Sequence, residues 1–159
     1  MANYCITNYV FTGSKEEIAE LYSIFNKKYS DDSNDNNWLG NIVAEILDPN
    51  YTLYHRGWFW NVKLEDENTL SFETETAWHP CYQLFDFISK RYFLSYYFKG
   101  YEPNCGVYVT NDVNKKYFKY GIKYNVINER DIKGHIAVER YMANFINKDM
   151  LYKIVKQLD

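Results

Sequence analysis

Two kinds of hydrophobic pattern alternate along this chain, and their order constrains the fold more than any other feature of the sequence. Apolar residues at every second position predict strands, and apolar residues at i, i+3, i+4 and i+7 predict helices. In chain order these patterns give a strand at 3–11, a helix from Ser14 to Tyr29, a short helix at 39–47, strands at 58–64 and 70–74, a helix at 80–92, strands at 94–99, 106–110 and 117–124, and helices at 138–145 and 151–158. The order β-α-α-β-β-α-β-β-β-α-α predicts an α+β protein.

Within that order, the succession β-α-β-β-α-β is that of the ferredoxin-like split β-α-β fold, an antiparallel sheet with its helices on one face. A length of 159 residues and an apolar fraction of 47% suit one hydrophobic core. We therefore expect a single domain over residues 1–159. Residues 1–124 are expected to form the core and added edge strands, and residues 125–159 a C-terminal helical extension. The polar stretch 30–37 predicts a loop inside this domain.

Local signals mark where several elements begin and end. Ser14 and Glu17 form a capping box at the start of the first helix, and Pro80 suits the first position of the later core helix. Residues 65–68 are expected to form the turn between two strands of a hairpin. The first of these strands is expected to present one alternating apolar face, made of Trp58, Trp60, Val62 and Leu64.

The composition excludes several classes of protein. No apolar run is long enough to span a membrane and no signal peptide is recognisable, so we expect a cytoplasmic protein. The three cysteines, Cys5, Cys81 and Cys105, are too far apart for a zinc or iron–sulfur ligand set and odd in number for a disulfide framework. The sequence therefore predicts no metal and no cofactor.

Aromatic residues are unusually abundant, at 19% of the chain with 17 tyrosines. Charge is also uneven, because residues 1–80 hold 5 lysines and arginines against 13 acids, whereas residues 81–159 hold 13 against 8. Aromatic and basic residues share the segment 90–124. Tyrosine is favoured both in strands and in protein interfaces. We therefore expect a binding surface on the sheet, formed by Tyr97, Lys99, Tyr108, Lys119 and Tyr120.

Three segments carry a family resemblance: residues 3–8 with Gly13 after them, residues 76–80, and residues 101–106. Together they resemble the YubB-type family, small ferredoxin-like proteins of plasmids, phages and integrated elements, over residues 1–112. The matching motif residues are Trp78, Pro80, Glu102, Pro103 and Gly106. The chain departs from the family pattern at Cys81, where a second proline is usual, and at Tyr101 and Asn104, where a tryptophan and a glycine are usual. The resemblance implies a fold and a mobile-element setting, and no activity.

Three functions follow as alternatives. The leading one is a non-enzymatic, protein-binding accessory protein of a mobile element that contacts a host or element-encoded protein; an antagonist of host defence, such as an anti-CRISPR protein, fits this description. The second is single-stranded nucleic-acid binding, in which tyrosines stack on bases and lysines neutralise phosphates. The third is an enzyme that uses Glu73, Glu75, His79 or Glu102 for acid–base chemistry, which requires these groups to meet in one pocket.

Overall fold

The computed structural model describes residues 4–29, 37–47, 53, 55–102, 107–112 and 114–118, and only the backbone at Tyr29, Tyr101, Val107 and Tyr108. In chain order the elements are β1 (Tyr4–Thr12), α1 (Lys15–Tyr29), α2 (Leu39–Ile46), β2 (Gly57–Asp66), β3 (Thr69–Ala77), α3 (Tyr82–Arg91), β4 (Ser95–Glu102) and β5 (Val107–Thr110). The chain is α+β as predicted, and these eight elements follow the expected order.

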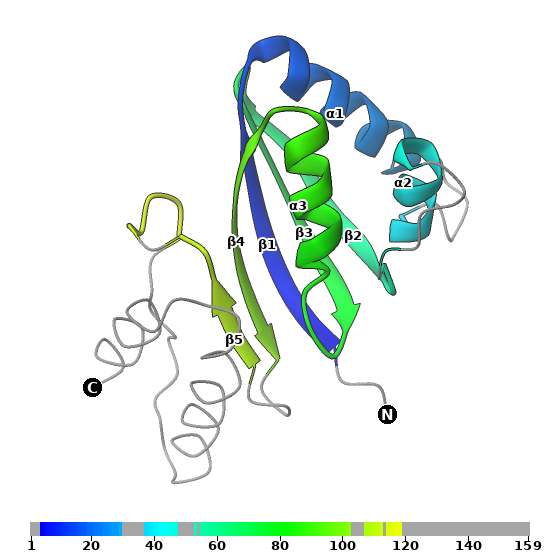
Figure 1. Ribbon diagram of the computed structural model, residues 1–159, viewed down its shortest axis with the longest axis vertical. Coiled ribbons are helices and arrows are strands. Elements are labelled where there is room, and N and C mark those ends of the chain that lie inside the picture. Colours follow the sequence, from blue (N-terminus) through cyan, green and yellow to red (C-terminus); the bar gives the residue numbers. More distant parts are fainter. Residues whose placement is uncertain are drawn as a thin grey trace, which may run out of the picture.

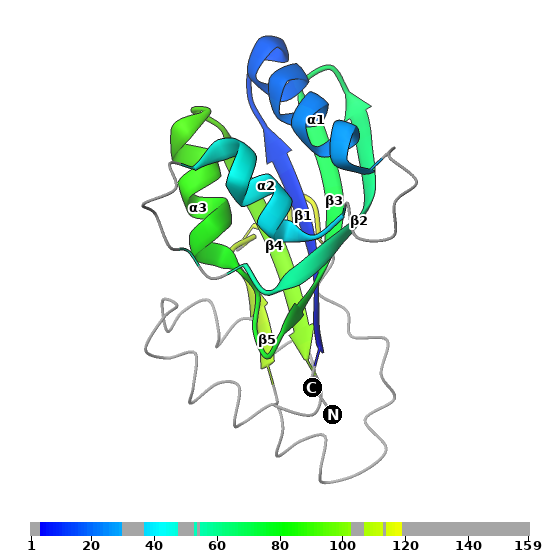
Figure 2. The same ribbon diagram turned by 90° about the vertical axis from the view of Figure 1, so that its right-hand side faces the viewer.

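The five strands form one antiparallel sheet in the order β2-β3-β1-β4-β5. β1 is central, and the three helices cover one face of the sheet (Figure 1, Figure 2). The predicted helices at 138–145 and 151–158, and residues 119–124 of the last predicted strand, lie outside the described residues. Residues 117 and 118 are not in a strand, so the prediction was wrong at the start of that segment.

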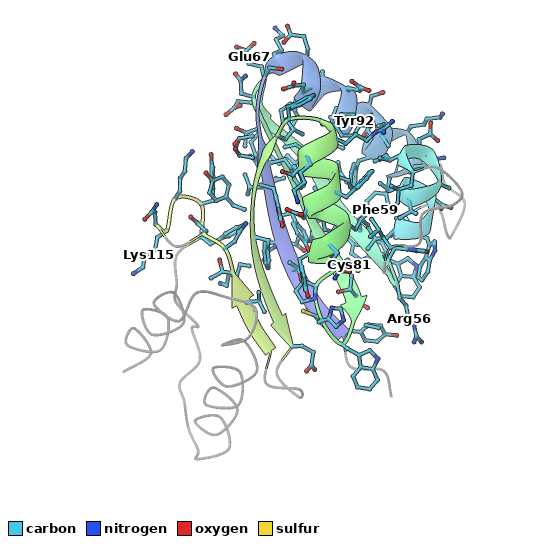
Figure 3. The ribbon with its side chains drawn as sticks, in the orientation of Figure 1. Arg56, Phe59, Glu67, Cys81, Tyr92 and Lys115 are labelled. Carbon is cyan, nitrogen blue, oxygen red and sulfur yellow. The ribbon has the colours of Figure 1, made fainter. Side chains whose placement is uncertain are left out.

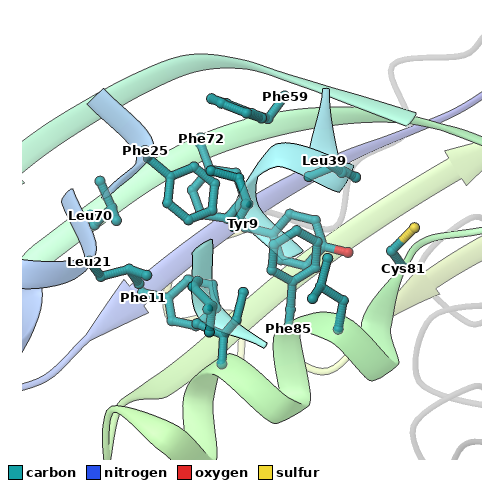
Figure 4. Close-up of a cluster of buried hydrophobic side chains, with 14 of the residues drawn as sticks. Tyr9, Phe11, Leu21, Phe25, Leu39, Phe59, Leu70, Phe72, Cys81 and Phe85 are labelled. Atoms are coloured by element: carbon teal, nitrogen blue, oxygen red, sulfur yellow. The ribbon is translucent and has the colours of Figure 1, made fainter. Parts of the chain in front are cut away.

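An aromatic cluster fills the space between the sheet and the helices (Figure 4). Tyr9 of β1 lies at its centre, with ring centroids 4.1 Å from Phe85 of α3 and 5.3 Å from Phe72 of β3. Phe25 of α1 closes the other side, 4.7 Å from Phe72. Such ring pairs add to the free energy gained by burying their apolar area. Part of the aromatic surplus of this sequence is therefore core and not surface.

The apolar face predicted for the first hairpin strand was wrong. The residue of β2 that is buried in the core is Phe59, whereas Trp58 and Trp60 point to the opposite face. A register shift follows Trp60, and Asn61 there adopts a φ of 52°, which is typical of an irregularity that inserts an extra residue. Beyond it Val62 packs against the core. The alternation therefore changes phase inside this strand.

Pro80 also differs from its prediction, because α3 begins at Tyr82 and Cys81 is its N-cap residue. Pro80 instead lies against Gly100 of β4. A Cβ atom at Gly100 would lie 2.6 Å from Cγ of Pro80 and 3.0 Å from Oγ1 of Thr7. This close approach requires glycine at position 100 and seats the segment that leads into α3 directly on the sheet.

The capping box of α1 is confirmed. The Glu17 amide donates to Ser14 Oγ at 3.3 Å, and Glu17 Oε2 accepts from the Ser14 amide at 3.3 Å. The same end of the molecule holds the hairpin turn, which is shorter than predicted because β2 continues to Asp66 and only Glu67 and Asn68 lie between the strands. The Asn68 side chain donates to the Gly13 carbonyl at 2.9 Å, so the turn is tied to the start of α1.

Replacing Ser14 by alanine removes an acceptor for the free amides of the first turn of α1. We expect Ser14→Ala to lower the free energy of unfolding by about 1 kcal/mol, measured by urea denaturation followed by circular dichroism. The matched control is Ser23→Ala, at an exposed position within the same helix. Equal stability of the Ser14→Ala protein and the wild type would contradict this role.

Candidate functional site

The face of the sheet opposite the helices carries the candidate binding surface, called here the open face. Side chains directly opposite each other on paired strands share a face. The register therefore places one row across the sheet through Trp60, Glu73, Asn8, Lys99 and Thr110. A second row contains Trp58, Glu75 and Ile6, and a third contains Lys63, Ser71, Val10 and Tyr97. In the part of the chain that the structure describes, no helix packs on this face, because α1, α2 and α3 all lie on the other side of the sheet (Figure 1).

The predicted binding residues divide into three groups. Tyr97 and Lys99 lie on the open face and are half-buried. Tyr108 is in β5, where its backbone pairs with that of Tyr101, and its side chain is not described. Lys119 and Tyr120 lie outside the described residues.

The Tyr97 ring is not free in solvent as the sequence suggested. It packs against Tyr117 with a centroid distance of 4.8 Å, and the Lys116 ammonium lies 5.4 Å from the Tyr97 centroid and 5.0 Å from that of Tyr117. The phenol of Tyr117 and then that of Tyr97 raise the pKa of Lys116 above its ordinary value, so the ammonium stays charged. These contacts form a cation–π cluster at one side of the open face.

The residues described after β5, 111–112 and 114–118, hold this cluster in place. The Asn111 side chain continues the strand pairing, because its Oδ1 accepts from the Phe98 amide at 2.7 Å and its Nδ2 donates to the Tyr96 carbonyl at 3.0 Å. Asp112 is buried, and its carboxylate accepts from the amides of residues 116, 117 and 118 at 2.9, 2.7 and 2.9 Å. Lys115 marks this loop in Figure 3, on the side of the sheet away from α3. The sequence did not identify Asp112, because no residue spacing indicates that its carboxylate accepts three backbone amides.

The other half of the open face is acidic and carries tryptophan. Glu73 and Glu75 of β3 lie beside Trp60 and Trp58 of β2, respectively, and Asn61 Nδ2 donates to Glu73 Oε2 at 3.1 Å. Trp58 also packs against Trp38, with ring centroids 4.9 Å apart. The sequence would have placed Trp58 and Trp60 on this face only if Asn61 had been recognised as the residue where the alternation of β2 changes phase.

The four candidate catalytic residues do not meet. Glu73 and Glu75 are on the open face, whereas Glu102 alternates with Lys99 and Tyr101 and is 1% exposed on the helix-covered side. His79 lies in the segment before α3, where its Nδ1 is 2.9 Å from the Pro80 carbonyl oxygen. Among the described residues no group of histidine, cysteine and acidic side chains could hold a metal ion.

Two of the residues on which the family resemblance rests, Trp78 and Pro80, lie in the segment between β3 and α3. Trp78 is exposed and has a φ of 70°, and the Thr76 hydroxyl donates to the His79 carbonyl at 2.8 Å. Pro80 packs on Gly100, as described above. Pro103 and Gly106 lie outside the described residues. Trp78 and Pro80 therefore have a structural explanation: they set the path of the chain between β3 and α3.

Under α3 the core contains several polar groups. Cys5 Sγ lies 3.7 Å from Thr7 Oγ1, and within the described residues the buried hydroxyls of Tyr9 and Thr74 have no hydrogen-bond partner. Burial first, and then the nearby Cys81 and Cys5, raise the pKa of Tyr9 well above its ordinary value. Burial likewise raises the pKa of the Cys81 thiol to about 12. Both groups are therefore protonated at neutral pH, and the Cys81 thiol is not an activated nucleophile.

Comparison with protein-family models, curated proteins and solved structures gives no match to this chain. Among the described residues, no helix combines the length and the apolar character needed to cross a membrane.

Removing the buried Tyr9 hydroxyl is expected to cost no stability. An unpaired buried hydroxyl carries a desolvation penalty of about 1–3 kcal/mol, and phenylalanine keeps the ring packing. Tyr9→Phe should therefore unfold in urea at the same or a higher midpoint than the wild type. Tyr9→Leu, which removes the ring contacts, is the control that should lower the midpoint. A marked loss of stability in Tyr9→Phe would show that the hydroxyl has a partner.

Replacing Asp112 by asparagine puts an amide donor against backbone amides. We expect Asp112→Asn to destabilise the protein by about 1–3 kcal/mol and to speed hydrogen exchange at the amides of Lys116, Tyr117 and Phe118. The measurement is hydrogen exchange followed by mass spectrometry or NMR. Asn114→Ala, an exposed change in the same loop, is the control. Unchanged exchange at the three amides would contradict the proposed role of the carboxylate.

Proposed function

We propose that this chain is a non-enzymatic protein-binding module with a ferredoxin-like core, and that the open face of its sheet is the contact surface. The order β2-β3-β1-β4 supports the fold assignment, because two β-α-β units interleave with β3 between β1 and β2 and with β1 between β3 and β4. β5 then extends the β4 edge.

One observation carries the functional proposal. Ile6 lies in the central strand, paired on both sides, and is nevertheless 53% exposed on the open face. Trp60 is 43% exposed on the same face. Glu73 and Glu75 of β3 lie between Ile6 and Trp60, and protein–protein contact surfaces combine apolar and polar side chains in this way. Aromatic side chains such as Trp60 are also enriched at the centres of such surfaces.

The geometry favours binding over catalysis. Glu102 lies on the opposite face of the sheet from Glu73 and Glu75, and Glu73 is hydrogen-bonded to Asn61. A pair of carboxylates on a flat sheet also excludes no water, whereas acid–base catalysis needs a shaped and partly dry site.

The geometry also favours a protein over single-stranded nucleic acid. Lys116 does provide a cation beside two tyrosine rings, and Lys99 lies on the same face of the sheet, which is the observation that supports the second candidate. However, the rings of Tyr97 and Tyr117 contact each other and the Lys116 ammonium, so their faces are occupied. Glu73 and Glu75 on the same face would repel phosphates.

The mobile-element setting rests on the resemblance to the YubB-type family alone. Nothing in the contacts of the open face identifies a host-defence system as the target. We therefore propose, from this resemblance, the role of an element-encoded accessory protein, which includes that of a host-defence antagonist.

A photo-crosslinking amino acid in place of Ile6 tests the contact surface inside cells that express the protein. We expect p-benzoyl-phenylalanine at position 6 to form a defined covalent protein adduct on illumination. The matched control places the same amino acid at Ala19, on the exposed side of α1. No adduct from position 6, or the same adducts from both positions, would overturn the proposal. Nuclease-sensitive adducts from position 6 would favour nucleic-acid binding.

A further inference from the structure

We infer that the occupant of the open face is a second copy of this chain, which forms a symmetric dimer with the two sheets face to face. This inference rests on the proposed function, since it names the partner of the same surface. It is carried by the way in which charge is divided across the sheet.

The open face is acidic on one side of β1 and basic on the other. In the row through Asn8, Glu73 lies on the β3 side and Lys99 on the β4 side. Glu75 adds to the first half and Lys116, held over Tyr97, adds to the second. Lys63, which lies in β2 opposite Ser71, forms an ion pair with Glu65 and so leaves the net charge of the acidic half unchanged. The two halves are thus complementary to each other.

Two-fold symmetry converts this division into attraction between copies. An axis midway between two facing sheets and parallel to β1 exchanges the two sides of the face, so Glu73 of each copy lies over Lys99 of the other. Both pairs form at once, because a symmetric contact repeats every interaction. An axis in the same plane but perpendicular to β1 would instead set Glu73 over Glu73. The charges therefore select one orientation, in which the β1 strands of the two copies run in the same direction.

The centre of the face suits this arrangement. Ile6 of β1 would lie along the axis, where it faces its counterpart in the other copy and loses water. Five strands about 4.8 Å apart and four to ten residues long offer roughly 600 Å² per copy. That is below the ~800 Å² per partner of a standard interface. We therefore expect a weak, reversible and salt-sensitive dimer.

Sedimentation equilibrium of the purified protein over the micromolar range provides the first test. We expect the mass to rise from 19.1 kDa towards twice that value with concentration, and to rise less at high salt. Glu73→Lys and Lys99→Glu should each weaken self-association at least about tenfold, because each variant faces itself with two like-charged pairs. Glu20→Lys on α1, which makes the same charge change away from the sheet, should leave association unchanged.

Mixing the two variants provides the decisive measurement. Lys at position 73 of one copy then faces Glu at position 99 of the other, and the remaining Lys99 faces the remaining Glu73, so the mixture should dimerise like the wild type. If either variant fails to fold, as judged by circular dichroism, the substitution Asn8→Cys replaces this test in a Cys105→Ser background. A short bismaleimide should then link two copies through position 8, which lies beside the axis.

The outcomes separate this inference from the proposed function. A wild-type protein that stays monomeric, a mixture that does not recover, or an absence of linkage through position 8 in the replacement test would overturn the dimer. If the Ile6 photo-adduct contains a different protein while the purified chain is monomeric, the contact surface stands and only the second copy is wrong. If no protein adduct forms and the chain is monomeric, both proposals fail.

Discussion

The central strand β1 is the constraint on which the rest of the structure depends. It pairs with β3 on one edge and β4 on the other, so every side chain on it points either to the helices or to the open face. Tyr9 and Phe11 begin the aromatic core on the first side, and Ile6 and Asn8 form the middle of the second. A shift of one residue in this strand would exchange core and surface entirely.

The contacts around Tyr9 show how that core is ordered. Three rings from different elements, Phe72, Phe85 and Phe98, surround it within 6 Å of its centroid. The Tyr9 hydroxyl is buried and has no hydrogen-bond partner among the described residues. Ring packing must therefore offset the free energy lost when this hydroxyl is removed from water. The abundance of tyrosine suggested a binding surface, but a tyrosine such as Tyr9 can instead belong to the core.

The sequence predicted the elements far better than their ends and faces. Simple periodicity located β1, α1 and α3 correctly because each buries one unbroken stripe or alternating face. It failed in β2, where Asn61 reverses the alternation, and at Pro80, which meets Gly100 across the sheet and does not start the helix. Both errors arise from contacts between distant segments, which a local pattern cannot contain.

The candidate surface was predictable in part for the same reason. Alternation in residues 94–99 placed Tyr97 and Lys99 together on one face, and that is their position in the sheet. It could not show that Lys116 and Tyr117 return to cover Tyr97, because that return depends on Asp112 accepting three backbone amides. Nor could it show that Glu73 stands opposite Lys99 across Asn8, since strand order decides that pairing. The opposed charges of the open face are thus a product of topology: two segments of unlike composition become neighbours only because β1 lies between them.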